Sequence, residues 1–271
     1  YLEVDSWSQE IRFVSPSDKR LRWIAGGYVI QTDRYISTGN QVDRGFGVFD
    51  VKKTPRVSVF VDPTDPSPQF SLLEDSQDNL AWAVFGEIAY DITDKLEGSF
   101  SLRYDLDDRE NTTETNPIYD PTGLDLVPGT KRSEDWDDLQ PKVTLRYQPT
   151  EDTTIYGGYS RGFRSGGFNQ SGVGEAVPNP GVQDLFDEQT ADTYEVGIKS
   201  IFWDGRANAA LSVFYTDFDG AYFFFFDPGT STQNLGNIDN TEYVGLEFEG
   251  SASLTDSFSV NVGRGVTDSE I

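Results

Sequence analysis

The sequence predicts an all-β fold, an antiparallel β-barrel that spans a membrane. Within residues 96–107, apolar or small side chains alternate with polar ones, and a period of two places the two sets on opposite faces of one strand. A strand of about 9–11 residues crosses a bilayer at a tilt, so one face meets lipid and the other meets the lumen. No wholly apolar run is longer than residues 221–226, whereas a membrane-spanning helix needs about 20 residues, so a helical membrane protein is excluded.

About ten such strands follow one another along the chain. They are expected at residues 8–15, 21–33, 80–92, 96–107, 137–148, 153–164, 190–202, 207–218, 241–254 and 257–268. Pro141 cannot donate a hydrogen bond to a neighbouring strand, so it predicts a bulge or a weak point of register. The chain ends at Ile271 without the aromatic residue that ends complete outer-membrane barrels, so these strands are expected to be part of a larger barrel.

Short and long connections alternate between these strands. Turns are expected at residues 15–18, 93–95, 149–152, 203–206 and 255–256, and long polar segments at residues 34–78, 108–135, 165–189 and 219–240. The pair Asp204 and Gly205 is a strong signal for a hairpin turn. Bacterial outer-membrane barrels have this asymmetry, with short turns on the periplasmic side and long loops outside. A soluble sandwich has no reason to collect its long loops at one end.

Composition limits the chemistry that the chain can perform. Its 271 residues include no Cys and no His, which removes disulfides, thiolate metal sites, the commonest metal ligand and the usual general base. We therefore expect no catalytic residue, no cofactor and no enzymatic activity. The formal charge of -25 argues against nucleic-acid binding, which requires Lys and Arg. The acidic stretches 105–108 and 135–138 offer oxygen ligands for calcium, but neither has EF-hand spacing, and no metal site is predicted.

Several segments resemble a known family. Residues 156–169, with the sequence YGGYSRGFRSGGFN, resemble the Y-x-S-x-G-F-R-S-G-G-F-N segment of TonB-dependent outer-membrane receptors. Residues 193–200, with the sequence TYEVGIKS, resemble the Y-E-x-G-x-K strand of the same receptors, and residues 237–249 resemble the hairpin that follows it. Residues 9–12 and 23–28 are similar to an earlier hairpin, so the resemblance covers most of the chain in the family's order.

The resemblance implies a fold, a location and a function. Family members have a 22-stranded barrel with an N-terminal plug domain, so residues 1–271 are expected to be a partial barrel domain of about ten strands, without the plug. The absence of Met and of a secretion signal likewise predicts a processed product or an internal fragment. The implied function is transport across the bacterial outer membrane: a scarce ligand, expected to be a ferric siderophore, binds outside and is imported with energy from TonB. The expected partners are the TonB system acting through the plug, outer-membrane lipid, and a ferric chelate or other small ligand.

Two other classes of protein remain open on the sequence alone. A passive porin-like or structural barrel needs no plug. A secreted β-sandwich that binds glycans packs its apolar strand faces against each other, about 10 Å apart. Between its two sheets it buries Phe100, Leu102, Val143 and Leu145. The ligand of a receptor is open as well, because cobalamin, plant glycans and aromatic compounds are alternatives to a siderophore.

Candidate ligand-binding residues lie in the expected external loops or beside them. They are Arg161, Arg164, Phe168, Asn169, Tyr222 and Phe223. Arg161 and Arg164 either contact an anionic ligand such as a ferric chelate or, as we favour, form salt bridges with loop carboxylates. The glycines of residues 157–167 either serve close packing and turns, which we favour, or contact the ligand. The aromatic residues 222–226 either continue a strand into the aromatic belt, which we favour, or offer a loop surface on which a ligand stacks.

A lumenal polar network is expected on the inner face of the barrel. Its members are Glu195, Lys199, Glu247 and Glu249. Glu195 and Lys199 fall on the strand face opposite Val196, and the other two carboxylates alternate with apolar residues in the same way. We expect these side chains to pack against the plug, because a carboxylate pair without a shaped cleft is weak support for acid-base catalysis.

Overall fold

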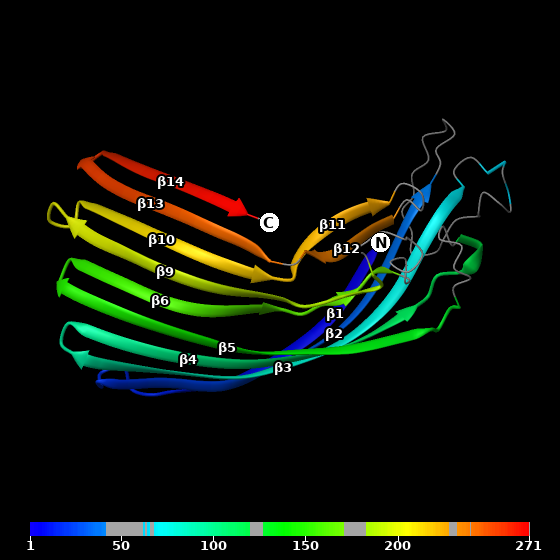
Figure 1. The fold of residues 1–271 in the computed structure, drawn as a ribbon, viewed down its shortest axis with the longest axis horizontal. Coiled ribbons are helices and arrows are strands. Elements are labelled where there is room, and N and C mark those ends of the chain that lie inside the picture. The colour runs from blue at the N-terminus through cyan, green and yellow to red at the C-terminus, as the bar shows by residue number, and fades with distance from the viewer. Residues whose placement is uncertain are drawn as a thin grey trace.

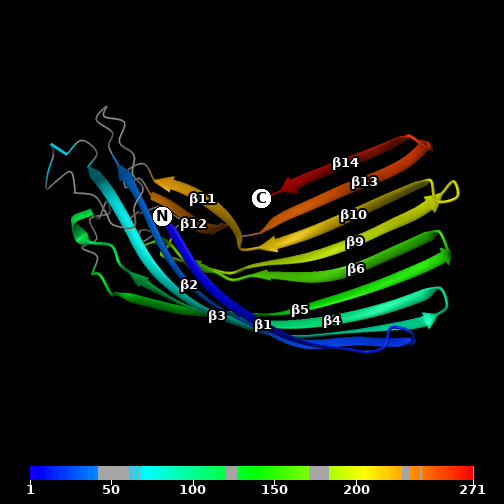
Figure 2. The same ribbon diagram turned by 180° about the vertical axis from the view of Figure 1, so that it is seen from behind.

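The computed structural model describes residues 1–41, 62, 64, 65, 68–119, 127–170, 183–227, 232–238 and 240–270. Its main element is one antiparallel sheet in the order β1-β2-β3-β4-β5-β6-β9-β10-β13-β14, curved into an open trough (Figures 1 and 2). The strands are β1 (Leu2–Val14), β2 (Leu21–Gln41), β3 (Gln69–Thr93), β4 (Leu96–Thr113), β5 (Lys131–Thr150), β6 (Thr153–Arg164), β9 (Gln189–Phe202), β10 (Ala207–Asp219), β13 (Thr241–Thr255) and β14 (Phe258–Glu270). The predicted all-β fold and its ten long strands are confirmed.

Two short hairpins lie in the connections that were expected to be long loops. β7 (Gly167–Phe168) pairs with β8 (Leu185–Phe186), and β11 (Ala221–Asp227) pairs with β12 (Thr232–Ile238). A 3₁₀ helix, η1 (Pro117–Tyr119), follows β4. Among the described residues there is no helix with the length and apolarity needed to cross a membrane.

Short turns gather at one end of the sheet and the hairpins at the other (Figure 1). In the β9–β10 turn, the Arg206 amide donates to the Trp203 carbonyl at 3.0 Å, and Asp204 and Gly205 have φ angles of 55° and 84°. Positive φ at both central residues is what a type I′ hairpin turn requires. The predicted Asp-Gly turn is therefore confirmed.

Four strands continue into polar segments that were expected to be loops. β2 extends to Gln41 and β4 to Thr113, whereas β3 begins as early as Gln69 and β5 as early as Lys131. They remain paired with their neighbours along the described ladders. The prediction of long connections at 34–78 and 108–135 is wrong for these parts, and residues 42–61 and 120–126 lie outside the described residues. These extensions lie beyond the lipid and bury polar as well as apolar side chains, such as Leu72, Leu73 and Asp75, so no apolar alternation marks them in the sequence.

Pro141 interrupts one ladder of β5 and leaves the other intact. It pairs with Leu102 of β4 in an unshifted register, so the predicted bulge is absent on that side. The ladder between β5 and β6 ends at the pair Lys142 and Ser160, although both strands continue beyond it. Because proline has no N–H to donate, pairing stops at the weak point that the sequence predicts.

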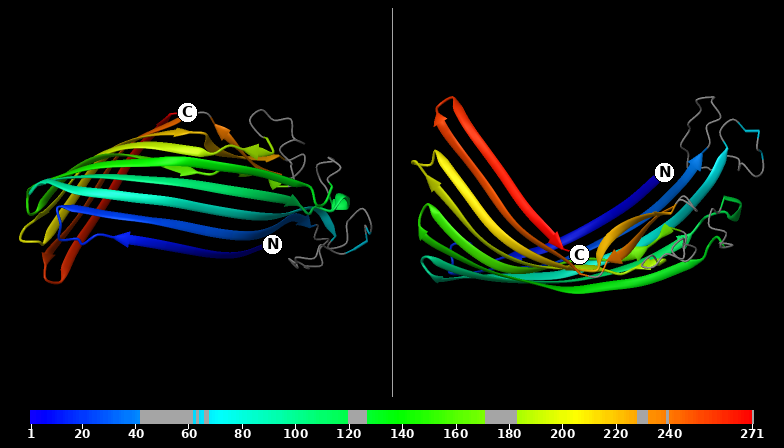
Figure 3. Two further views of the ribbon diagram at one scale, coloured as in Figure 1. Left: turned by 90° about the horizontal axis from the view of Figure 1, so that it is seen from below. Right: turned by 45° about the horizontal axis from the view of Figure 1, so that its top comes forward.

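The middle of the sheet is apolar on its outer face. Side chains exposed there include Val84, Ile88, Phe100, Leu102, Val143, Leu145, Val196, Val213 and Leu246. The sheet is a single layer (Figure 3), and Phe100 and Leu145 are 47% and 53% exposed. The β-sandwich alternative is therefore wrong, since it requires these side chains to be buried between two sheets. A broad exposed apolar face on a long-stranded sheet is typical of a lipid-facing surface.

Aromatic side chains border this apolar band. Tyr159, Tyr194 and Tyr215 lie side by side on β6, β9 and β10, with successive ring centroids 5.1 Å and 6.4 Å apart. Phe202 and Trp203 pack edge to face at the other end of β9. The strand from Tyr194 to Phe202 is about 26 Å long at about 3.3 Å per residue, and at a tilt of about 40° it spans about 20 Å of the apolar band, which is about 25 Å tall in outer-membrane barrels. The two groups therefore occupy the positions of aromatic girdles.

Candidate ligand-binding site

Both hairpins fold over the polar inner face of the sheet near its loop end (Figure 3). Two arginines of that face hold the segment around β7. Arg109 of β4 donates to the Gly166 carbonyl at 2.7 Å, and Arg132 of β5 donates to the Asn169 carbonyl at 3.1 Å. The most buried side chains of the described chain collect in this region, among them Leu72, Leu73, Asp75, Asn111, Thr115, Trp136 and Asn234. The packed core therefore lies at the loop end, beneath the hairpins.

Arg132 is the main anchor of the β7–β8 hairpin. Its guanidinium pairs with Asp184, which precedes β8, and lies 3.3 Å from a carboxylate oxygen of Asp75 in β3. It also stacks on Phe168, with the guanidinium carbon 5.4 Å from the ring centroid. The side chains of Asp75 and Arg132 are only 2% and 16% exposed. Removing one of them therefore leaves the other as an unpaired charge that is shielded from water, which is strongly destabilising. Sequence patterns do not mark Arg132, because Asp184 and Asp75 lie 52 and 57 residues away along the chain.

Asn169 joins the two hairpins to each other. Its Nδ2 donates to the carbonyls of Gln183 and Leu235 at 2.6 Å and 2.8 Å, and its Oδ1 accepts from the Leu235 amide at 2.8 Å. Asn169 is 4% exposed, so these bonds are shielded from water. One amide hydrogen is used within the β7–β8 segment and the other in connecting it to β12. A direct contact of this side chain with ligand stays a prediction.

A cavity of about 400 Å³ opens between the hairpins and the upper parts of β2 and β3. Its apolar lining includes Phe168, Phe186, Phe226, Ile36, Leu73 and Leu235. Its polar lining includes Arg34, Asn40, Asn169, Gln170 and Gln233. Ligand sites in proteins have volumes of about 300–1,000 Å³ and combine apolar walls with a few polar groups. This mouth cavity is therefore the candidate ligand-binding site.

Arg34 brings positive charge to the mouth cavity. The residue is half-buried on the inner face of β2, and it forms no hydrogen bond or ion pair with the residues that the structure describes. Burial lowers the pKa of Arg34, an effect that Asp75 opposes and Arg109 reinforces. A partly desolvated guanidinium without a bonded counter-charge favours an anionic ligand. Arg34 lies outside the motifs that resemble the receptor family, so sequence reasoning missed it.

A second cation lies beside the mouth cavity. Arg164 is exposed at the end of β6, and its guanidinium carbon lies 4.8 Å from the ring centroid of Tyr222. Tyr222 donates from its hydroxyl to the Ser165 carbonyl at 2.7 Å and packs edge-on against Phe186, with ring centroids 5.3 Å apart. Burial raises the pKa of Tyr222 to about 12, so the hydroxyl remains a neutral donor at physiological pH.

The two candidate arginines behave differently. Arg161 bonds to Asp138 of β5 and Asp192 of β9 at 3.1 Å, and it does not line the mouth cavity. Arg161 forms salt bridges as favoured, but with carboxylates of strands and not with the predicted loop carboxylates. Arg164 forms no ion pair within the described part of the chain, so its salt bridge stays a prediction.

Residues 222–226 do not continue β10 into the aromatic belt. They belong to β11, which pairs with β12 in a separate two-stranded sheet. Gly220, with a φ of 69°, turns the chain away from β10, and a Cβ there would lie 2.5 Å from the Glu188 carbonyl. The favoured strand-top interpretation is therefore wrong, and the segment is a loop hairpin. Phe226 lines the mouth cavity, whereas alternation places the half-buried Phe223 on the opposite face of β11.

The four predicted lumenal residues share the polar face of the sheet. Glu195, Lys199, Glu247 and Glu249 occupy alternate positions of β9 and β13. The Tyr156 hydroxyl donates to Glu195 at 2.6 Å, and the Lys199 ammonium lies 5.4 Å from the Tyr156 ring centroid. Glu247 and Glu249 are exposed and form no ion pair with other described residues. This stretch of the inner face therefore presents uncompensated negative charge.

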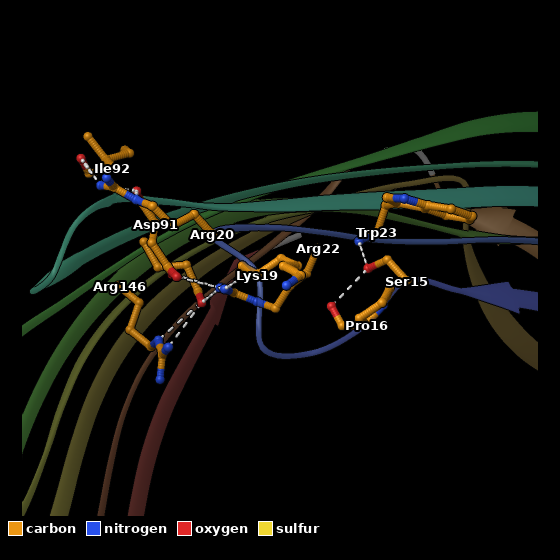
Figure 4. A network of polar contacts seen from close by, with 10 residues as sticks. Ser15, Pro16, Lys19, Arg20, Arg22, Trp23, Asp91, Ile92 and Arg146 are labelled. Carbon is orange, nitrogen blue, oxygen red and sulfur yellow. Dashed lines mark hydrogen bonds and ion pairs between the residues drawn. The ribbon is translucent and has the colours of Figure 1, made fainter.

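A further polar network joins the turn ends of β2 to β5 (Figure 4). Arg22 donates to both carboxylate oxygens of Asp91 at 2.7 Å and to Glu97 at 2.5 Å. Glu97 also accepts from Arg146 at 3.1 Å and 3.2 Å. Arg20 adds a bond of 2.9 Å to the Asp91 carbonyl. The network ties four neighbouring strands together at the end of the sheet opposite the mouth cavity.

The acidic stretches 105–108 and 135–138 do not converge on a metal site. Within the described residues, no three acidic side chains lie together in an arrangement that could hold an ion. Asp105 accepts from Arg103 and Gln140, each at 2.6 Å, and Asp107 pairs with Arg109. The charges of Asp105 and Asp107 are therefore balanced by neighbouring arginines.

Taken together, these features define a class of protein. A single antiparallel layer with an apolar outer face, a polar inner face, turns at one end and a ligand-sized cavity at the other is part of the wall of a transmembrane β-barrel. Residues 5–269 match the family described as TonB dependent receptor-like, beta-barrel. The chain therefore belongs to the TonB-dependent receptor family, whose barrels lie in the bacterial outer membrane.

Three comparisons show the extent of this similarity. The probable TonB-dependent siderophore receptor PiuA of Acinetobacter baumannii is 24% identical over 217 residues, which cover 80% of this chain and 27% of that protein. The structure of the ferric yersiniabactin uptake receptor FyuA from Yersinia pestis has a TM-score of 0.72 and 16% identity, covering 99% of this chain and 36% of that one. The structure of PiuA has a TM-score of 0.68 and 17% identity, covering 99% of this chain and 38% of that one. At such identities the structural likeness shows the fold, and the chain spans 27–38% of the length of these relatives.

Proposed function

We propose that this chain is part of an outer-membrane receptor that binds a ferric siderophore at its mouth and imports it with energy from TonB. The observation that carries the proposal is the mouth cavity of about 400 Å³, which combines aromatic walls with Arg34, a cation that pairs with no carboxylate of the described residues. In barrels of this kind the long connections face outward, so the cavity lies where a ligand arrives. A siderophore complex offers acidic oxygen atoms to Arg34 and apolar surface to the rings.

Relatives with the same fold support this assignment. PiuA is described as a siderophore receptor, FyuA as a ferric yersiniabactin uptake receptor, and Fiu of Escherichia coli as a ferric-catecholate import receptor. Another relative, OprC, is described as a copper transporter. The fold therefore serves more than one cargo, and the cargo must be argued from the cavity.

The inner face supplies a surface for the plug domain. Glu195, Glu247 and Glu249 present negative charge toward the lumen, and a plug with basic groups at matching heights would pair with them. Such pairs at a wet interface are individually weak, which permits TonB to displace the plug without unfolding the barrel. Ligand binding at the mouth and plug movement in the lumen thus use separate sets of side chains.

Uptake of radioactive iron tests this proposal. Cells that produce the intact protein as their sole ferric siderophore receptor are supplied with labelled ferric siderophores, in strains with and without TonB. We expect uptake that requires both the protein and TonB. Uptake that is equal without TonB would support the passive porin-like alternative and refute the proposal.

A pair of variants connects uptake to the mouth cavity. Arg34→Gln removes the cavity cation and is expected to weaken ferric siderophore binding about tenfold, the scale of one charge-assisted hydrogen bond. Lys131→Gln is the matched control, because Lys131 carries the same charge at the same end of the sheet, where it is 61% exposed and pairs with Glu110. Equal losses in both variants would indicate a general charge effect and contradict a role of the cavity.

A further inference from the structure

The β11–β12 hairpin exposes large aromatic rings outside the lipid-facing band. Phe224 and Phe226 are 58% and 49% exposed, and alternation places them with Tyr222 on one face of β11. Phe186 meets that face through Tyr222, and Phe168 and Phe186 line the same cavity as Phe226. Exposed rings gathered at a cavity outside the membrane mark a binding surface, because water solvates them poorly.

Two cations lie next to this aromatic surface. Arg34 lines the cavity and Arg164 covers the ring of Tyr222, and neither is bonded to a carboxylate among the described residues. Asp75 is the acidic residue whose charge acts on Arg34, and its carboxylate is already bonded to Arg132 and Asn111. The site therefore combines flat apolar faces with available positive charge.

The common classes of ferric chelate differ in their negative charge and in the flat apolar surface that they offer. A ferric trihydroxamate is neutral, and its chelating groups are not aromatic. Ferric citrate is anionic but has no flat apolar surface to cover the rings. A ferric tricatecholate has both, since its aryl rings stack on Phe side chains and its phenolate oxygens carry negative charge toward arginine.

We infer that the ligand of the mouth cavity is an anionic ferric chelate whose chelating groups are aryl oxygens, as in catecholates and phenolates. This inference rests on the proposed function and narrows its substrate class. A cavity of about 400 Å³ is at the small end of the range for drug-sized ligands, so it holds one or two aryl arms and leaves the metal centre at its opening. Phe226 and Phe186 stack on the arms and Arg34 meets the phenolate oxygens inside the cavity, while Arg164 on Tyr222 adds positive charge nearby.

Equilibrium binding to three probes tests the inference. The intact protein, purified in detergent, is titrated with ferric tris(catecholate), a ferric trihydroxamate and ferric citrate, and binding is followed by quenching of protein fluorescence. We expect the catecholate complex to bind at least about tenfold more tightly than either of the others. Tighter binding of the trihydroxamate or of citrate would overturn the aryl assignment and leave siderophore import intact. Binding of none of the three would contradict the proposed function itself.

Variants of Phe226 locate the interaction in the cavity. Phe226→Ala is expected to weaken catecholate binding about five- to tenfold, the scale of one aromatic contact, with little effect on the other two probes. Phe226→Trp keeps a flat ring in the exposed hairpin and is expected to retain affinity. If Phe226→Ala weakens all three probes equally, or if Phe226→Trp fails to retain affinity in a folded protein, stacking on this ring is not the basis of selection.

Discussion

Replacing Asn169 with Ala removes the side-chain hydrogen bonds that join the two hairpins of the mouth. Two of them connect Asn169 to the amide and the carbonyl of Leu235 in β12, each at 2.8 Å, and a third reaches the Gln183 carbonyl. A buried hydrogen bond contributes about 1 kcal/mol net, so the two bonds to Leu235 stabilise docking of β11–β12 by about 2 kcal/mol. At about 1.4 kcal/mol per factor of ten, the undocked population of this hairpin is expected to rise about 30-fold.

Hydrogen exchange of the Asp187 amide measures this change, because that amide donates to Asn237 of β12 at 2.9 Å, a bond between the two hairpins that the substitution leaves in place. We expect its exchange in Asn169→Ala to be about 30-fold faster than in the unsubstituted protein, with the β2–β5 ladders unaffected. Asn208→Ala is the control for a side-chain bond lost elsewhere, since it removes one exposed bond, to Ser251 at 2.7 Å, at the far end of the sheet. Unchanged exchange at Asp187 in Asn169→Ala, or an equal change in Asn208→Ala, would refute the role assigned to Asn169.

Three other predictions concern the anchor, the pH dependence and the orientation of the sheet. Arg132→Met removes the cation shared by Asp184 and the nearly buried Asp75, and is expected to lower the stability of the loop end by about 3 kcal/mol; unchanged resistance of β7–β8 to proteolysis would contradict this. Burial raises the pKa of Tyr222 from 10.0 to about 12, so its stabilisation of the hairpin is complete below pH 10 and is lost as the pH rises through 12. The phenolate absorbance that Tyr222→Phe removes should accordingly titrate near pH 12, and a midpoint near 10 would disprove burial of the hydroxyl. Leu102→Arg places a charge on the lipid face and is expected to cost about 2–4 kcal/mol in folding into vesicles, whereas Ser101→Arg on the lumenal face should be tolerated; equal losses would contradict the assigned faces.

The membrane-spanning part of the fold follows from the sequence because lipid imposes a pattern on it. Apolar side chains must alternate with polar ones along each strand, and the Asp204-Gly205 turn requires residues that accept positive φ. Both signals are local, so the strands and their short turns are predictable. The extensions of β2 to β5 lie beyond the lipid and bury polar as well as apolar side chains, and this removes the alternation that would have revealed residues such as 69–79 as strand.

The candidate site is less predictable because it depends on contacts between distant segments. Tyr222 and Asn169 belong to recognisable segments, but their roles depend on hairpin docking, which joins Asn169 to a residue 66 positions away. Arg34 lines the cavity because β2 and β3 stay paired beyond the lipid-facing band, which places Arg34 opposite the hairpins. A strand of two residues, as in β7, is too short to produce any periodic signal.

The position of iron in a crystal of the intact receptor decides whether the mouth cavity holds the ligand. Crystals grown with a ferric tris(catecholate) would be measured at the iron absorption edge, where anomalous scattering locates the metal independently of the protein. We expect one iron peak at the opening of the mouth cavity, with aryl rings against Phe186 and Phe226 and phenolate oxygens near Arg34. An iron peak elsewhere in the barrel, with the cavity empty of ligand, would contradict this expectation.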